Sequence, residues 1–223
     1  MTQLEKPQAF LFDWDNTLVN TWPVITLALN STLAYMGHEP WSEERVKRDV
    51  KRSMRDSFPE LFGERWEEAA TRYQNDYRAL HLEHLAPLPN ALTLLETLAK
   101  TGAFLGVVSN KRGASLRTEI EHLGWKSFFQ STIGADDATR DKPHPDPAIL
   151  ALKDSGIPQG KHIWFIGDTG VDLECAHAIG ATAILYGDHG VKAKEHDGFS
   201  FDAHVRNHEA LLVLLTESKL IAP

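Results

Sequence analysis

The stretch Phe10-Leu11-Phe12-Asp13-Trp14-Asp15-Asn16-Thr17-Leu18-Val19 places two aspartates directly after a short apolar run. Residues 8–12 are too few for a globular helix and are flanked by polar residues, which predicts a buried strand. A buried strand points its carboxyl end at the crevice where open α/β sheets bind ligands. Asp13 and Asp15 therefore lie where a binding site is expected.

Two carboxylates this close repel each other unless a cation lies near them, and hard cations such as Mg2+ prefer oxygen ligands. A carboxylate can also attack phosphorus, as in enzymes that form an aspartyl-phosphate. The same stretch also fits a structural role, in which Asp15 or Asn16 forms an Asx-turn that caps a following helix. The rest of the chain has to decide between these interpretations.

Composition and charge limit the class of protein. The chain has 223 residues and 42% hydrophobic content, enough for one full domain and a smaller one. Its formal charge of -8 would repel nucleic acid and anionic lipid, so neither a nucleic acid nor a membrane is an expected partner. A single cysteine, Cys175, excludes an intramolecular disulfide, and residues 1–6 lack the apolar core of a signal peptide. We therefore expect a cytoplasmic protein, and the oligomeric state stays open.

A helical segment is expected to interrupt the fold after the first strand. No convincing strand occurs from Pro40 to Leu88. Helices are predicted from Trp22 to Gly37 and over residues 42–50, 53–62 and 64–84. The last of these carries an apolar stripe at helical spacing, which we interpret as core: Trp66, Ala70, Tyr73, Tyr77 and Leu80. We predict a helical domain over residues 21–86, inserted into a domain formed by residues 1–20 and 87–223.

From Pro89 onward, predicted helices and strands alternate. Helices are expected over residues 91–100, 113–123, 146–155, 171–179 and 209–218, and strands over residues 104–108, 131–133, 163–166 and 183–186. The helix at 146–155 is predicted to have Asp146 as its N-cap and Pro147 in its first position. This alternation predicts an α/β fold with a parallel, Rossmann-like sheet and helices on both faces.

Polar residues follow four of the predicted strands, and in a parallel sheet these strand ends meet at one edge. They are Asp13 and Asp15, then Ser109 and Asn110, then Asp141 and Lys142, then Asp168, Thr169 and Asp172. Phosphoryl transfer needs a nucleophile, carboxylates that hold a metal, a cation for the phosphoryl oxygens and a hydroxyl donor, and all four are present. Each also has a simpler reading, as a helix cap or, for Lys142, as a solvated loop residue.

These strand ends resemble the four motifs of the haloacid dehalogenase-like hydrolases. The first is Asp13-Trp14-Asp15-Asn16-Thr17, the second Val107-Val108-Ser109-Asn110, the third Lys142-Pro143 and the fourth Gly167-Asp168-Thr169-Gly170-Val171-Asp172. The helical insert is similar to the cap of the phosphoglycolate phosphatase-like branch. Asn16 replaces the usual glycine, but asparagine tolerates the left-handed backbone that glycine would adopt.

The resemblance implies an Mg2+-dependent phosphatase that acts on a small phosphorylated metabolite through an aspartyl-phosphate. It implies that Asp13 is the nucleophile, Asp15 the acid and then the base, and Lys142 the cation beside the phosphoryl group. Phosphate binding is assigned to Thr17, Ser109 and Asn110. The metal ligands are expected among Asp13, Asp15, Asp168 and Asp172.

Three alternatives stay within or beside this chemistry. Dehalogenases of the same superfamily do not need the second acidic residue, so Asp15 argues against one. A phosphoglucomutase-like transferase needs the same residues, and the sequence does not separate it from a hydrolase. A non-catalytic binding module with this fold is disfavoured by the intact carboxylates and Lys142.

The expected helical cap carries one conspicuous basic cluster, formed by Lys47, Arg48, Lys51, Arg52 and Arg55. We hypothesise that Arg52 or Arg55 contacts the leaving group of a small anionic phosphate ester, because arginine pairs well with a carboxylate or phosphate. The alternative is a solvated helix face that leaves specificity elsewhere.

Overall fold

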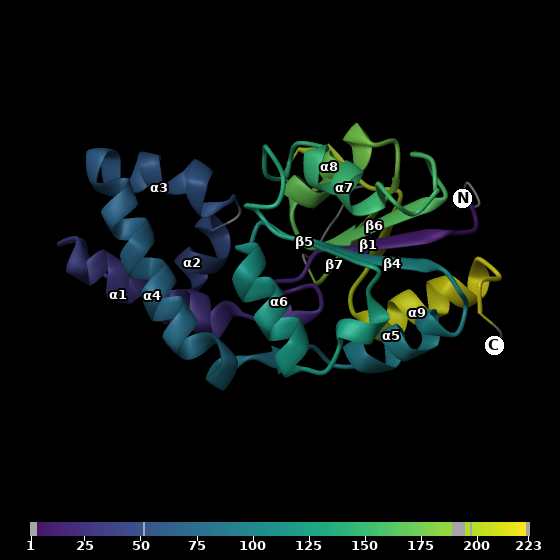
Figure 1. Cartoon of the computed structure of the whole chain (residues 1–223), viewed down its shortest axis with the longest axis horizontal. Helices are drawn as coiled ribbons and strands as arrows, with labels where there is room; N and C mark the ends of the chain where they lie inside the picture. The colour runs from purple at the N-terminus through teal and green to yellow at the C-terminus, as the bar shows by residue number, and fades with distance from the viewer. Residues whose placement is uncertain (1–3, 51, 189–194, 197, 222–223) are drawn as a thin grey trace. The chain divides into compact units, whose positions relative to one another are not determined.

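The computed structural model describes residues 4–50, 52–188, 195–196 and 198–221, so Lys51 of the basic cluster lies outside the described residues. The chain divides into two compact units. One unit comprises Met1–Val19 and Pro87–Pro223, and the other comprises Asn20–Ala86. We call them the α/β unit and the helical unit (Figure 1).

Among the described residues of the α/β unit, six strands form one sheet in the order β10-β7-β6-β1-β4-β5. Every neighbouring pair is parallel, which confirms the predicted fold class. The strands are β1 (Ala9–Phe12), β4 (Phe104–Val108), β5 (Ser131–Ile133), β6 (Ile163–Gly167), β7 (Thr182–Tyr186) and β10 (Ala203–Val205). Strand β10 was not predicted, because a three-residue strand at the sheet edge has too few positions to show a pattern.

Helices cover both faces of this sheet. In Figure 1, α7 and α8 lie on one face, and α5, α6 and α9 lie on the other. Their bounds are α5 (Ala91–Ala99), α6 (Gly113–His122), α7 (Asp146–Leu152), α8 (Gly170–Ala178) and α9 (His208–Glu217). A 3-10 turn, η2 (Lys126–Phe128), follows α6, and a short antiparallel pair is formed by β8 (Glu195–His196) and β9 (Phe199–Ser200).

The prediction for α7 was wrong at both ends. Pro145 is the N-cap residue and no side chain caps the helix, while Asp146 accepts two 3.0 Å hydrogen bonds from Arg140 instead. The Asp146 carboxylate therefore pairs with a nearby arginine and does not cap the helix. The helix ends at Leu152, and the chain continues in tight turns toward Gly156, whose φ of 71° no helix accepts.

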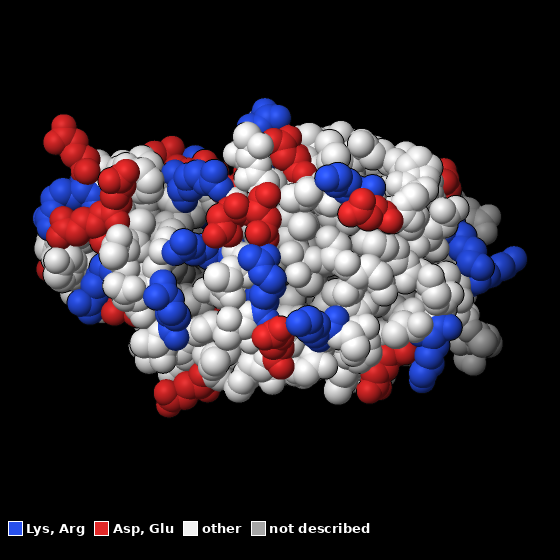
Figure 2. Space-filling model, viewed as in Figure 1, with Lys and Arg blue, Asp and Glu red and all other residues white. Residues whose placement is uncertain are grey.

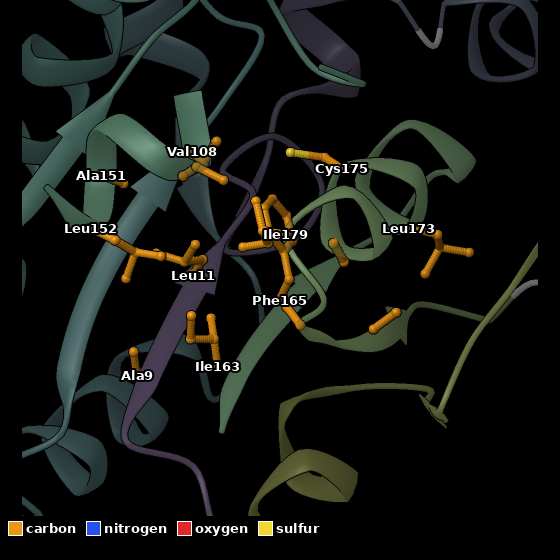
Figure 3. Packing of buried hydrophobic residues seen from close by; sticks show 14 of the residues in the cluster. Ala9, Leu11, Val108, Ala151, Leu152, Ile163, Phe165, Leu173, Cys175 and Ile179 are labelled. Carbon is orange, nitrogen blue, oxygen red and sulfur yellow. The ribbon is translucent and has the colours of Figure 1, made fainter. Parts of the chain in front are cut away.

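Strand β1 is the centre of the packing, because all four of its residues are fully buried. Ala9 and Leu11 join the cluster beneath α7 and α8, in which Leu11 packs near Phe165 and Leu152 (Figure 3). Phe10 faces the opposite side and packs edge-on against Trp164, with ring centroids 5.9 Å apart. Burial on both faces explains why this strand reads as a continuous apolar run.

The order of the strands positions the site. Strands β4 and β5 follow β1 on one side of the sheet, and β6, β7 and β10 follow it on the other side. The order therefore reverses between β1 and β6, where open α/β sheets form a ligand crevice at the carboxyl ends of the strands. Phe12 pairs with Val107 and Ile166, so Asp13 follows directly at this reversal point.

The helical unit contains α1 (Trp22–Tyr35), α2 (Glu43–Asp49), α3 (Met54–Phe62), the 3-10 turn η1 (Gly63–Arg65) and α4 (Trp66–His84). The predicted stripe of α4 is core, as expected. Ala70 and Tyr77 are buried, and Tyr73 packs edge-on against Phe58 of α3 with ring centroids 5.5 Å apart. No helix of the described residues is both long and apolar enough to cross a lipid bilayer.

Two short strands, β2 (Val19–Asn20) and β3 (Ala86–Pro87), mark the places where the chain passes from one unit to the other and returns. Within the α/β unit, the backbone N–H of Leu88 donates to the carbonyl of Leu18 at 3.0 Å. Leu18 and Leu88 are thus held side by side, although 69 residues lie between them in the sequence.

A close contact between two glycines fixes the loop that follows β4. A Cβ added to Gly134 would lie 2.4 Å from the backbone N and Cα of Gly113, and 2.7 Å from the carbonyl oxygen of Lys111. These neighbours are backbone atoms that belong to the start of α6 and the loop before it, so they cannot rotate away. Only glycine fits at position 134.

We therefore expect Gly134→Ala to lower the free energy of unfolding by about 1–3 kcal/mol, the usual cost of overpacking a buried site. Urea denaturation followed by circular dichroism measures it. Gly156→Asn is the matched control, since a Cβ there meets no atom within 4 Å and asparagine tolerates the left-handed backbone. Equal stability of the Gly134→Ala variant and the control would contradict this account of the packing.

Candidate active site

Asp13 lies at the carboxyl end of β1, in the crevice where the strand order reverses. Its backbone N–H donates to the carbonyl of Ile166 at 2.8 Å, which continues the pairing with β6 by one residue. Its carboxylate is buried, with the residue only 7% exposed, and accepts a 2.7 Å hydrogen bond from the ammonium of Lys142. The first aspartate of the sequence motif is thus held rigidly and paired with a cation.

Lys142 is the cation at the centre of the site. Its Nζ donates to three acceptors at 2.7 Å each: Asp13 Oδ1, Asp172 Oδ1 and the carbonyl of Val108. Asn110 holds the backbone of Lys142 from both sides, since its Oδ1 accepts from the N–H of Lys142 and its Nδ2 donates to the carbonyl, both at 2.9 Å. Both polar atoms of the Asn110 side chain are therefore engaged with this loop.

Asp168 and Asp172 come from the segment after β6. Asp172 is 2% exposed, and its Oδ2 accepts from the backbone N–H and hydroxyl of Thr169, which forms a capping box at the start of α8. A Cβ on Gly167 would lie 2.2 Å from the Asp172 side chain, so this glycine makes room for the carboxylate. Oxygen atoms of Asp13, Asp168 and Asp172 all lie within 4.8 Å of one another.

The cluster of Asp13, Asp168, Asp172 and Lys142 carries an excess of negative charge. Burial raises the pKa of Asp13 to about 7, because the opposing effect of Lys142 is countered by Asp172 and Asp15. Burial, followed by repulsion from Asp13 and Asp172, raises the pKa of Asp168 well above its ordinary value. Three carboxylates with one lysine thus favour a further cation, and donors that are all oxygen suit Mg2+. The residues present fit a divalent metal site.

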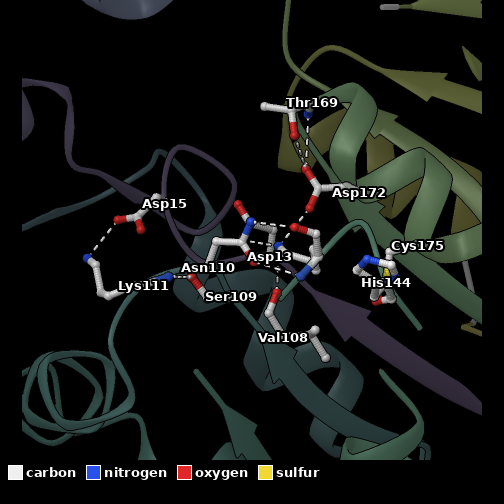
Figure 4. Close-up of polar contacts among 11 residues, drawn as sticks. Asp13, Asp15, Val108, Ser109, Asn110, Lys111, His144, Thr169, Asp172 and Cys175 are labelled. Atoms are coloured by element: carbon white, nitrogen blue, oxygen red, sulfur yellow. Dashed lines mark hydrogen bonds and ion pairs between the residues drawn. The ribbon is translucent and has the colours of Figure 1, made fainter. Parts of the chain in front are cut away.

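Asp15 belongs to a different environment, although it follows Asp13 by two residues. Its carboxylate is not one of the three grouped oxygen donors, and Figure 4 shows it directed toward Lys111. The Nζ of Lys111 forms an ion pair with Asp15 Oδ1 at 2.7 Å and with Glu119 Oε2 at 2.6 Å. Of the four predicted metal ligands, the structure brings together Asp13, Asp168 and Asp172 and places the carboxylate of Asp15 elsewhere.

Lys111 and Glu119 were not among the predicted site residues. Two signals could have found them. Lys111 directly follows the polar strand end Ser109-Asn110, and Glu119 lies beside Ile120 and three positions from Leu116, on the buried face of the predicted helix. A glutamate on an apolar helix face requires a partner.

The two predicted phosphate-binding hydroxyls are both buried in the crevice loops. Thr17 is fully buried, and its Oγ1 has no hydrogen-bond partner among the described residues. Asn16 before it has a φ of 60°, the left-handed backbone that was expected of asparagine here. Ser109 is 2% exposed, and its Oγ accepts from the backbone N–H of Lys111 at 3.1 Å.

The basic cluster lies in the helical unit, and most of its described members form ion pairs there. Arg52 contacts Glu60 through both guanidinium nitrogens, at 2.5 and 3.2 Å. Arg48 pairs with Asp49 and Lys47 with Glu43, while Arg55 is an exposed residue in the first turn of α3. On the face shown in Figure 2, basic and acidic side chains are interspersed over both units.

Comparisons with known proteins agree with this geometry. The family model of the haloacid dehalogenase-like hydrolases matches residues 10–186. The chain is 33% identical over 191 residues to a phosphoglycolate phosphatase from Rhodospirillum rubrum, covering 80% of this chain and 79% of that protein. It is 29% identical over 187 residues to an N-acetylmuramic acid 6-phosphate phosphatase from Pseudomonas aeruginosa, covering 81% of this chain and 82% of that protein.

Solved structures show the same fold. A haloacid dehalogenase-like hydrolase from Bacteroides fragilis superposes with a TM-score of 0.85 at 23% identity, covering 92% of this chain and 100% of that one. The family model spans all four strand-end motifs, and the sheet brings those motifs to one crevice. This chain belongs to the haloacid dehalogenase-like hydrolases.

Proposed function

We propose that this protein is an Mg2+-dependent phosphatase that hydrolyses a small phosphate monoester through an aspartyl-phosphate on Asp13. The observation that carries the proposal is the buried carboxylate of Asp13, held 2.7 Å from Lys142 beside Asp168 and Asp172. The phosphatase names of the relatives support the reaction class.

In the first step, a carboxylate oxygen of Asp13 attacks phosphorus while the bond from phosphorus to the leaving oxygen breaks. Lys142 remains beside the attacking carboxylate and counters the charge that gathers on the phosphoryl oxygens. The hydroxyls of Thr17 and Ser109 supply donors to those oxygens, and the unpartnered Thr17 Oγ1 suits that task best.

Asp15 transfers the proton in both steps. As the first bond breaks, Asp15 protonates the leaving oxygen, so an alcohol departs in place of an alkoxide. In the second step, Asp15 takes a proton from the water that attacks the phosphorus of the aspartyl-phosphate, and inorganic phosphate and free Asp13 result. The two roles require Asp13 to be ionised while Asp15 holds a proton. A metal ion held beside Asp13 would favour the ionised form of that carboxylate.

Asp13, Asp168 and Asp172 would hold the metal ion. When bound, Mg2+ supplies positive charge that reduces the repulsion between the anionic phosphoryl group and the attacking carboxylate.

The substrate proposed is a small phosphate monoester that also carries a carboxylate. Phosphoglycolate and N-acetylmuramic acid 6-phosphate, named for two relatives, are both of this kind. The helical unit is proposed to act as a cap that supplies specificity, with Arg52 or Arg55 contacting the leaving group. Contact with the substrate would cost Arg52 its two hydrogen bonds to Glu60.

Asp13→Asn is expected to lower kcat by at least about a thousandfold, because an amide of the same shape cannot attack phosphorus. Release of inorganic phosphate measures the loss, and circular dichroism verifies that the variant is folded. Asp154→Asn, at an exposed site after α7, is the control and should keep wild-type turnover. Near-normal turnover by a folded Asp13→Asn variant would rule out the nucleophile assignment.

Mg2+ is expected to raise the melting temperature by about 5 °C or more at saturation, as a ligand of the folded state does. Without metal, the raised pKa of Asp13 means that its ionisation costs more in the folded than in the unfolded chain, so stability falls as pH rises from about 4 to about 7. The Mg2+ effect should therefore be larger near pH 8 than near pH 5.5, where protons compete for the ligands.

Differential scanning fluorimetry with and without Mg2+ at both pH values measures these shifts. Asp168→Asn should abolish most of the Mg2+ effect, and Asp154→Asn should retain it. Full phosphatase activity in excess chelator, or an unchanged Mg2+ shift in Asp168→Asn, would contradict the metal assignment.

Arg55→Ala is expected to raise KM for a carboxylate-bearing phosphate ester by about tenfold, the value of one lost charge-assisted contact. Turnover of 4-nitrophenyl phosphate, whose leaving group has no carboxylate, should hardly change. Arg52→Ala is measured alongside, and Arg48→Ala, which breaks an exposed pair with Asp49, serves as the control. If neither Arg52 nor Arg55 separates the two substrates, the basic cluster is only a solvated face.

A further inference from the structure

Beneath the crevice, four side chains form a buried polar chain that lies outside the four sequence motifs except at Trp14 and Asp15. Lys111 Nζ contacts Asp15 Oδ1 at 2.7 Å and Glu119 Oε2 at 2.6 Å. The same Glu119 oxygen accepts a 2.6 Å hydrogen bond from the indole N–H of Trp14. The side chains of Lys111 and Glu119 are 6% and 0% exposed, while that of Asp15 is 22% exposed at the open end of the chain.

The far end of this chain is rigid. Glu119 projects from the buried face of α6, next to Ile120. Trp14 packs edge-on against Trp125, with ring centroids 5.8 Å apart. The Glu119 carboxylate is thus held between a helix and the loop that follows β1, and it has no access to water.

The backbone of Lys111 is also fixed. Its N–H donates to Ser109 Oγ at 3.1 Å, and its carbonyl accepts from the N–H of Ala135 at 2.9 Å. The lysine is therefore held at its backbone by the loops after β4 and β5, and at its ammonium group by Glu119. Few rotamers remain, and the place of the ammonium group beside Asp15 is well defined.

Stability alone does not account for such a group. A buried ion pair loses about as much hydration energy as it regains, and well-packed apolar residues often replace one at no cost in stability. This pair also ends on the carboxylate that we assign to proton transfer. Among the described residues, Asp15 Oδ1 has no hydrogen-bond partner beyond this ion pair.

We propose that Lys111, held in place by Glu119, is a positioning residue that fixes the Asp15 carboxylate for proton transfer to the leaving oxygen. The proposal rests on the proposed function, because it needs Asp15 as the acid. Lys111 itself does not touch the reacting atoms in this account. It acts by restricting Asp15, and misplacement of a catalytic group by about 1 Å can cost roughly a hundredfold in rate.

The loss of activity expected from a misplaced Asp15 depends on the leaving group. A general loss of structure would lower activity on every substrate, so comparing leaving groups separates the two explanations. An alkyl phosphate releases a strongly basic alkoxide and needs the proton from Asp15. A 4-nitrophenyl phosphate releases a stable phenolate and needs the proton little. The ratio kcat/KM reports the steps up to the first irreversible one, so it isolates the protonation step from later hydrolysis of the aspartyl-phosphate.

The test uses the double variant Lys111→Met/Glu119→Gln, which leaves no unpaired charge from this pair and keeps an amide oxygen for Trp14. The alkyl substrate is whichever of 2-phosphoglycolate, glycerol 3-phosphate and glucose 6-phosphate the wild-type enzyme hydrolyses fastest. We expect kcat/KM for it to fall by about 10–100-fold, and kcat/KM for 4-nitrophenyl phosphate to fall by less than about threefold. Lys126→Met, which breaks an exposed pair with Glu121, is the control and should change neither.

Asp15→Asn is assayed in parallel to separate the two proposals. If Asp15→Asn discriminates between the substrates and the double variant does not, the positioning proposal is overturned and the proposed function stands. If Asp15→Asn itself fails to discriminate, both the acid role of Asp15 and its positioning by Lys111 are overturned. Equal losses of kcat/KM by the double variant on both substrates also overturn the positioning proposal, since a purely structural role gives that result. If the double variant does not fold, the single Glu119→Gln variant, which keeps Lys111, repeats the measurement.

Discussion

The three hydrogen bonds of the Lys142 ammonium hold the crevice together. They join the end of β1 through Asp13, the end of β4 through Val108 and the start of α8 through Asp172. Burial lowers the pKa of this lysine, but the two carboxylates outweigh burial and raise it, so the group stays charged at neutral pH. Removing this one cation would leave two buried carboxylates unpaired, which costs far more than the net value of the pair.

Much of the fold was predictable because the signals for it are local. Strand β1 is an apolar run of four buried residues, and Gly37, Gly102, Gly124 and Gly180 follow helices where such signals predict an end. The strand-end residues could also be predicted, since a parallel sheet brings its carboxyl ends to one edge whatever the details of packing. Strand β10 and the ends of α7 could not, because they depend on an edge pairing and on the Arg140–Asp146 contact.

The hydrogen-bond and ion-pair partners of the site residues could not be predicted from the sequence. Lys142 and Asp13 are 129 positions apart, and nothing local pairs them. Asn110 was expected near phosphate as the last residue of the second motif. Its amide instead contacts the backbone of Lys142 on both sides, and only the path of the loop after β5 reveals this. The role of Glu119 could not be predicted for a similar reason. A helical pattern shows which face of a helix is buried, but not which cation that face contacts.

The separation of Asp13 from Asp15 follows from a turn in the backbone. On an extended strand, residues two apart point the same way, so strand geometry would place the two carboxylates together. Strand β1 ends at Phe12, however, and the carbonyl of Trp14 accepts hydrogen bonds from the N–H groups of Leu18 and Val19, which turn the chain directly after the strand. Trp14 is fully buried and bonded to Glu119, which anchors the segment between the two aspartates. Asp13 therefore lies with the other carboxylates beside Lys142. Asp15 pairs with Lys111, and the left-handed backbone of Asn16 turns the chain directly after it. Two carboxylates two residues apart thereby acquire different cations and different exposure, which is the condition for giving them different tasks in one reaction.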